Sequence, residues 1–142
     1  MKNFAALCLI LAWLPLACKQ NTSQTSVSPV DSVRAVVMNL HNTEMEKMGE
    51  MKMLERALKI AIETADEEQD DVAYLSLSEA MIQLDSGIFA MKSWMRNWSE
   101  PDPLLPLSSQ LQGLARQHAS MKRTSELMNK GIIAAQTALT YE

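Results

Sequence analysis

Residues 36–54, VVMNLHNTEMEKMGEMKML, are the stretch around which the rest of this chain is organised. Apolar side chains recur in it at steps of three and four residues, which is the period of an amphipathic helix. The stretch also holds His41 and five of the chain's eleven methionines. Its apolar face continues from Val33 to Ile62, with one gap at Glu44. We therefore predict one long helix over about residues 29–65, started by the capping pair Ser28-Pro29.

Two further helices are predicted after this one. Over about residues 70–98, apolar residues follow a seven-residue repeat, as in coiled coils and antiparallel bundles. Three prolines through Pro106 end that helix, because proline cannot continue it. A third helix over about residues 107–139 keeps the same repeat. The predicted fold is all-α, an antiparallel up-down-up three-helix bundle over residues 29–142.

Composition supports a single helical domain and excludes one class of partner. The chain has 142 residues, with only four glycines and five prolines to mark turns. Its net charge is −4, and no cluster of Lys and Arg stands out. Binding to nucleic acid needs such a cluster to neutralise phosphates. We therefore expect no nucleic-acid partner.

The first 28 residues are typical of an export signal followed by a tether. A basic start precedes the apolar segment Phe4–Leu16, which is shorter than the roughly 20 residues needed to span a bilayer. It ends in Leu14-Pro15-Leu16-Ala17-Cys18, which resembles a bacterial lipobox, with Pro15 where leucine is usual. We predict a lipoprotein signal peptide over 1–17 and a lipidated Cys18 that begins a flexible tether over 18–28. The alternative is a plain secretory signal with a chance cysteine.

The predicted location follows from this reading. Acidic residues directly after the lipidated cysteine act as a surface-export signal in some bacteria, and this chain has none there. We therefore expect a membrane anchor on Cys18, in the cell envelope, at the outer membrane and facing the periplasm.

Two blocks of sequence resemble a known group of proteins. The first is Val37-Met38-x-x-His41-x-x-x-Met45-x-Lys47-Met48-Gly49, and the second is Met91-x-x-Trp94-Met95-x-x-Trp98-x-x-Pro101. Both are similar to small lipoproteins of Bacteroidetes-type bacteria that often carry the label "viral A-type inclusion protein". The resemblance implies a lipid-anchored helical bundle and no particular activity. The group usually has His-Asp-Glu where this chain has His41-Asn42-Thr43.

Signatures of catalysis are missing from the sequence. His41 is followed by Asn42-Thr43-Glu44-Met45, so there is no HExxH zinc motif, and no phosphate-binding glycine loop occurs. Both cysteines, Cys8 and Cys18, lie in the first 18 residues, which leaves no thiol nucleophile in the folded part. We expect no enzymatic activity and no required cofactor.

A soft-metal site is one alternative function. In an up-down-up bundle the first and third helices run parallel, and His41 and His118 lie at similar distances from their starts. Met45 and Met91 would lie near the same level. Two imidazoles and two thioethers form a ligand set that suits Cu(I). The competing interpretation is that the methionines fill the core and that Glu44 pairs with one of the histidines.

The remaining interpretation is a structural or partner-binding lipoprotein, which we consider the main prediction. Trp94, Met95 and Trp98 cluster at the end of the second predicted helix, and aromatic and methionine side chains favour adaptable interfaces. They are the predicted contact surface for an envelope protein. Core packing is the alternative explanation of this cluster. Gly49, on the first helix, is the predicted point of close approach by another helix.

Overall fold

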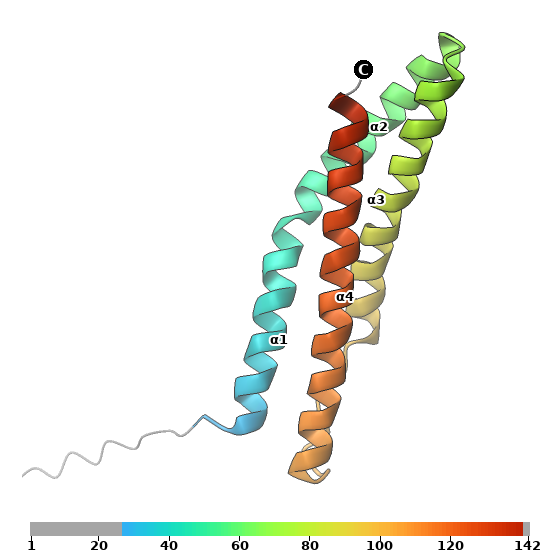
Figure 1. Cartoon of the computed structure of the whole chain (residues 1–142). Coiled ribbons are helices and arrows are strands. Elements are labelled where there is room, and N and C mark those ends of the chain that lie inside the picture. The colour runs from blue at the N-terminus through green and yellow to red at the C-terminus, as the bar shows by residue number, and fades with distance from the viewer. Residues whose placement is uncertain (1–26, 141–142) are drawn as a thin grey trace, which may run out of the picture.

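The computed structural model describes residues 27–140, and within them the chain is helical with no strand. The prediction of an all-α bundle is confirmed. In Figure 1 the chain rises through α1 (Pro29–Glu46) and α2 (Met48–Glu67), descends through α3 (Asp71–Asn97) and rises again through α4 (Leu107–Thr140). The predictions for the signal peptide, Cys18 and most of the tether lie outside the described residues. Of the helices in 27–140, none has a span long and apolar enough to cross a membrane.

Local side-chain chemistry starts two of the helices. At α1 the Asp31 amide donates to Ser28 Oγ at 3.1 Å, and the Ser28 hydroxyl donates to the Asp31 carboxylate at 2.7 Å. At α3 the amides of Val72 and Ala73 donate to Asp70 Oδ1 at 3.1 and 3.0 Å. These bonds satisfy amides that have no partner within the helix. The capping pattern that the sequence showed at Ser28 is therefore present in the structure.

The first helix differs from its prediction, because it is interrupted at Lys47. The Lys47 amide donates to the carbonyl of Glu44, three residues back, at 3.1 Å. This spacing tightens the helix locally, as a 3₁₀ turn does. The halves on either side then have different main neighbours: α1 packs on α4, and α2 packs mainly on α3. The break thus lets one long segment follow both other helices.

The core lies along the seam between α3 and α4, which is the most extensive helix pairing. Gly87 of α3 and Gly131 of α4 are both buried there. A Cβ atom on Gly131 would lie 2.7 Å from the carbonyl oxygen of Gln83 and from the Cα atom of Leu84. The two backbones can approach this closely only because neither glycine carries a side chain. The largest fully buried side chains are Met51, Leu58, Leu77, Leu84, Met91, Leu114, Met121, Met128 and Val37.

A charged cluster on the surface of α2 gives the protein a weak dependence on pH. Hydrogen bonds from Lys52 (2.6 Å) and Lys59 (2.9 Å) to the Glu55 carboxylate lower its pKa from 4.5 to about 2. A carboxylate with a depressed pKa stabilises the fold above its unfolded pKa and loses that contribution as the pH falls through the folded value. Both lysines are well exposed, so solvent screening holds the contribution below about 1 kcal/mol.

We expect Glu55→Gln to lower the free energy of unfolding slightly at pH 7. The gap between the variant and the natural protein should narrow between pH 4.5 and 2, because over this range Glu55 takes up a proton in the unfolded chain and stays largely ionised in the folded one. Urea unfolding at pH 7, 4 and 2 measures the gap. A gap that is the same at pH 7 and pH 2 would contradict the assigned cause.

Candidate functional site

Three aromatic rings join α1 to the end of α3. The His41 imidazole stacks on Trp94, with ring centroids 5.1 Å apart and an angle of 24° between the planes. Trp94 in turn lies 5.2 Å from Trp98, tilted by 36°. The sequence singled out His41 as a candidate metal ligand and the two tryptophans as a contact surface, and the structure places the three rings side by side. Contacts of this kind add about 0.5–1.5 kcal/mol to the burial of the rings.

Of the three residues in the predicted contact surface, one is buried and two are accessible. Trp94 is only 5% exposed, and its indole N–H donates to the backbone carbonyl of Gln117 on α4 at 3.3 Å. Met95 is exposed, and Trp98 is half-buried. Trp94 is thus a packing residue that ties α3 to α4, and it is not available to a partner. Met95 and the outer edge of Trp98 remain accessible.

The predicted soft-metal residues are only partly brought together. Met91 is fully buried, Met45 packs against the core, and His118 is half-buried on α4. His41 Nδ1 lies 3.1 Å from Asn42 Oδ1, whereas His41 Nε2 is buried and has no hydrogen-bond partner among the described residues. Within residues 27–140, no three His, Cys, Asp or Glu side chains are grouped so as to hold a metal ion. Any metal here would depend on thioether ligands.

Glu44 has a different partner from the one expected. Its carboxylate is 3% exposed and accepts two hydrogen bonds of 2.9 Å from the Lys47 ammonium, so neither histidine neutralises it. Lys47 also donates to Asn129 Oδ1 of α4 at 2.8 Å. The expectation of a His–Glu44 pair was wrong, because Lys47 follows Glu44 by one helical turn and reaches it without strain. This three-residue group fastens the break between α1 and α2 to α4.

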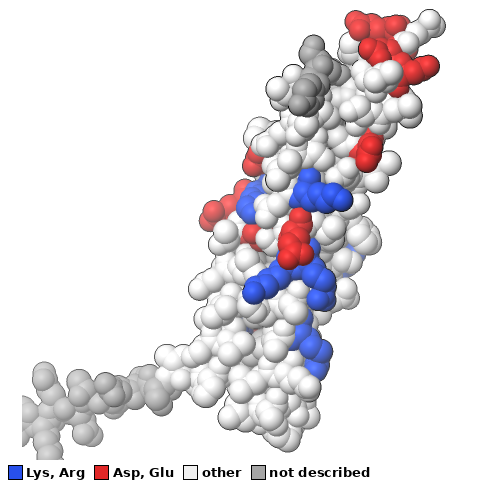
Figure 2. Space-filling view, in the orientation of Figure 1, with Lys and Arg blue, Asp and Glu red and all other residues white. Residues whose placement is uncertain are grey.

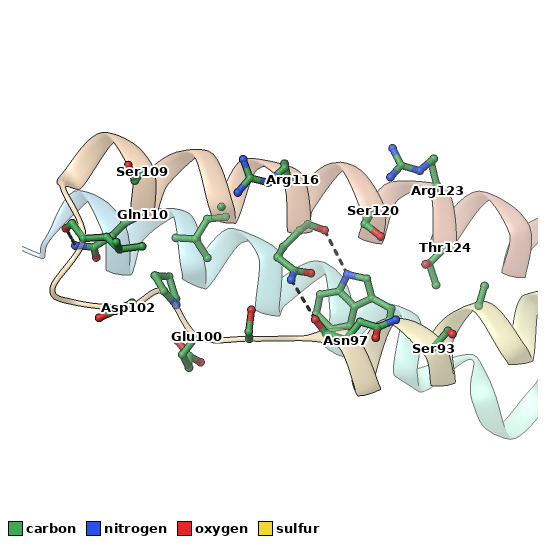
Figure 3. Close-up of a pocket in the computed structure, with 18 of the residues that line it drawn as sticks. Ser93, Asn97, Glu100, Asp102, Ser109, Gln110, Arg116, Ser120, Arg123 and Thr124 are labelled. Carbon is green, nitrogen blue, oxygen red and sulfur yellow. Dashed lines mark hydrogen bonds between the residues drawn. The ribbon is translucent and has the colours of Figure 1, made fainter.

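A groove of about 820 Å³ lies where α3, the loop over residues 98–106 and α4 meet. Its apolar lining includes Trp94, Leu105, Leu114 and Leu127. Figure 3 shows Arg116 and Arg123 along the α4 side of the groove, while Ser93 and Asn97 come from α3. Gln117 bridges the two helices there by donating to the Asn97 carbonyl at 3.3 Å. The groove therefore combines an apolar interior with two guanidinium groups.

Charge is distributed unevenly along the bundle. In Figure 2 basic side chains gather over α4, and acidic ones cover the far end, where α2 turns into α3. Arg116, Arg123 and Lys130 are spaced by seven residues and are all exposed, so they lie on one side of α4. The acidic end carries Asp66, Glu67, Glu68, Asp70 and Asp71.

The groove could not be predicted from the sequence, because its shape depends on how the loop after α3 folds back. The seven-residue spacing of Arg116 and Arg123 was the one available signal.

A comparison with protein-family models, curated proteins and solved structures finds no match for this chain.

Proposed function

We propose that this protein is a non-catalytic lipoprotein of the bacterial cell envelope, and that its up-down-up bundle binds a partner protein. Its membrane anchor is lipid on Cys18, supported by the lipobox-like Leu14–Cys18 segment that follows an apolar stretch. The tether over residues 18–28 keeps the bundle near the outer membrane, facing the periplasm. One observation carries the partner-binding role, the groove between α3 and α4.

The chemistry of this groove indicates the kind of partner. Its volume of about 820 Å³ lies within the range of small-ligand pockets, but it is partly open to solvent. Leu127 is exposed and Pro101 is half-buried within the groove, so both offer apolar contact, and guanidinium groups bind carboxylates through paired hydrogen bonds. A protein segment that presents apolar side chains beside Asp or Glu satisfies both parts. Arg116 and Arg123 are the residues on which its selectivity would depend.

Photo-crosslinking in cells tests this role. A photoreactive residue at Ser120, which lines the groove, should yield one discrete crosslinked product, and the same residue at the exposed Ser76 should not. The product should be lost in the Arg116→Glu, Arg123→Glu double variant and kept in Lys92→Glu, an exposed lysine of α3 outside the groove. Equal crosslinking from Ser76 and Ser120, or no effect of the two arginine reversals, would overturn the proposal.

Binding of Cu(I) is the second candidate function, and it is favoured by His41 Nε2. A buried ring nitrogen without a hydrogen bond is costly, and a metal ion would satisfy it. Met91 is fully buried and Met45 packs on the same core, so both are candidates for thioether ligands, with His118 as a fourth. Trp94 stacks on His41 and would report binding through its fluorescence.

A competition titration of residues 19–142 against a chromophoric Cu(I) chelator, under reducing conditions, tests this second candidate. Tight binding of one Cu(I) per chain that is lost in His41→Ala would support a metal-handling protein. No binding at micromolar copper would sink this candidate and leave the groove proposal untouched. The His118→Ala variant shows whether the second histidine takes part.

A further inference from the structure

The loop between α3 and α4, together with the first residue of α4, presents three leucines to solvent at one end of the bundle. Leu104 is 91% exposed, Leu105 49% and Leu107 51%, and we refer to these three residues as the leucine tip. Leaving three neighbouring leucines in water forgoes about 1.5–3 kcal/mol for each side chain that could be fully buried. Single exposed apolar residues need no explanation, but a group at the point of a loop does.

The amides at the turn of this loop are bonded within the loop. The Leu105 amide donates to the Asp102 carbonyl at 3.1 Å, and the Leu104 amide donates to Asp102 Oδ1 at 2.9 Å. Pro103 and Pro106 have no amide hydrogen. From residue 103 to residue 106, every N–H group therefore has a partner or does not exist.

Two carbonyl groups of the loop also accept hydrogen bonds. The Gln110 side chain donates to the Leu105 carbonyl at 2.8 Å, and the Pro106 carbonyl accepts the amides of Ser109 and Gln110 at 2.9 and 3.1 Å. A turn that exposes Leu104 and Leu105 while their amides are internally bonded is suited to a medium that offers few hydrogen bonds. The headgroup–acyl boundary of a bilayer approaches such a medium, and an unpaired backbone group is costly there.

We propose that the leucine tip enters the surface of a lipid bilayer and acts as a second membrane contact beside the anchor. This inference rests on the proposed attachment at Cys18. In Figure 1 the leucine tip and the start of α1 lie at the same end of the bundle. Cys18 precedes Val27 by about nine residues, which span at most about 32 Å. An anchored bundle therefore holds this end close to the membrane.

The contact is apolar, and its strength does not depend on lipid charge. Glu100 beside the tip is paired with Arg34 at 2.8 Å, and Asp102 is engaged in the turn. The basic side chains of α4 begin at Arg116, more than two helical turns beyond Leu107, or about 13 Å. The bilayer is thus approached by leucines and not by a basic patch. A lipid anchor is firm when a second signal reinforces it, which is the role that the leucine tip would fill.

An environment-sensitive dye on Leu104→Cys tests the proposal. Residues 19–142 contain no natural cysteine and hold the whole core, so this piece folds and takes a single label. An N-terminal histidine tag attaches it to zwitterionic vesicles that contain a nickel-chelating lipid, which replaces the natural anchor. The matched control is the label at Val72→Cys, an 80% exposed apolar position at the opposite, acidic end.

We expect the emission of the label at position 104 to shift to the blue on the vesicles and to be quenched by spin-labelled lipid, while the label at position 72 changes in neither respect. Adding anionic lipid should leave the shift unchanged. Without the tag, Leu104→Ser should weaken vesicle binding about tenfold, the loss expected for one leucine, and Val72→Ser should not.

Three results would overturn the proposal: a label at position 104 that stays in water, equal shifts at both positions, or a shift at position 104 that appears only when envelope protein is added. The last would assign the leucine tip to a protein partner. Because the tag replaces the lipid, none of these results depends on whether Cys18 is modified in cells. The natural modification is measured separately, by the mass of the mature chain.

Discussion

Replacing Gly131 by alanine is expected to destabilise the protein by about 2 kcal/mol, although alanine favours helices more than glycine does. The new methyl group would lie 2.7 Å from both the Gln83 carbonyl oxygen and the Leu84 Cα atom. Both are backbone atoms of α3, so no flexible side chain can move aside. The helices must separate, and the core between them loses contact. The cost of overpacking therefore exceeds the gain of about 1 kcal/mol in helix propensity.

Gly49→Ala is the matched control for this substitution. Gly49 is also helical, but a Cβ atom there would meet nothing within 4 Å. The same change should therefore stabilise the protein by about 0.5–1 kcal/mol. Urea unfolding of residues 19–142 gives both values. Opposite signs are expected, and a Gly131→Ala variant as stable as the natural protein would contradict the close contact of α3 with α4.

The second large effect is expected at Lys47. Lys47→Met leaves the Glu44 carboxylate, whose side chain is 4% exposed, without its ion-pair partner. Removing one member of a buried ion pair typically costs 3–5 kcal/mol. Because the Lys47 side chain is 29% exposed, water can approach, and we expect a loss of about 2–3 kcal/mol. The lost bond to Asn129 also loosens α4 from the break between α1 and α2.

A double variant separates two causes of the lost stability, the unpaired charge of Glu44 and the missing contacts of Lys47. Glu44→Leu combined with Lys47→Met removes both charges, and we expect most of the lost stability to return. Lys59→Met, which breaks an exposed pair with Glu55, should change little. If the double variant is less stable than Lys47→Met alone, the ion pair stabilises the protein by itself and the explanation through desolvation is wrong.

Helix starts and the general fold could be predicted because they depend on neighbouring residues. Ser28, Pro29 and Asp31 form a cap whose parts lie within four positions, and the seven-residue repeat of α3 marks its buried face. The turn between α2 and α3 was harder to place, because Gln69 adopts a left-handed φ of 59° where glycine is the usual signal.

The positions of the helix break and of the close contact could not be predicted from local pattern. Gly49 was the expected point of close approach, yet it is exposed, and the contact occurs at Gly87 and Gly131. Any glycine permits close packing, but the sequence does not show which glycine faces another helix. The break at Lys47 depends on Glu44, Lys47 and Asn129, and Asn129 is far away in the sequence.

The candidate site was predicted only in part, because some of its contacts join residues that are far apart in the sequence. His41, Trp94 and Trp98 were singled out from their sequence blocks, and the structure stacks them. Burial of Trp94 matches the alternative of core packing, but the sequence could not choose between the two, since burial depends on the approach of Gln117 from α4. The groove and the leucine tip both result from the fold of the proline-rich loop, in which the turn at Asp102 sets the direction of the leucines.

The proposed lipid anchor on Cys18 is tested by the intact mass of the mature protein from bacterial membranes. We expect a chain that begins at Cys18, has lost residues 1–17 and carries the added mass of lipid. Cys18→Ser should stay unprocessed, whereas Cys8→Ser, which changes the other cysteine, should mature normally. A mature chain without lipid, or one that begins elsewhere, would contradict the proposed anchor and with it the placement of this bundle at the membrane.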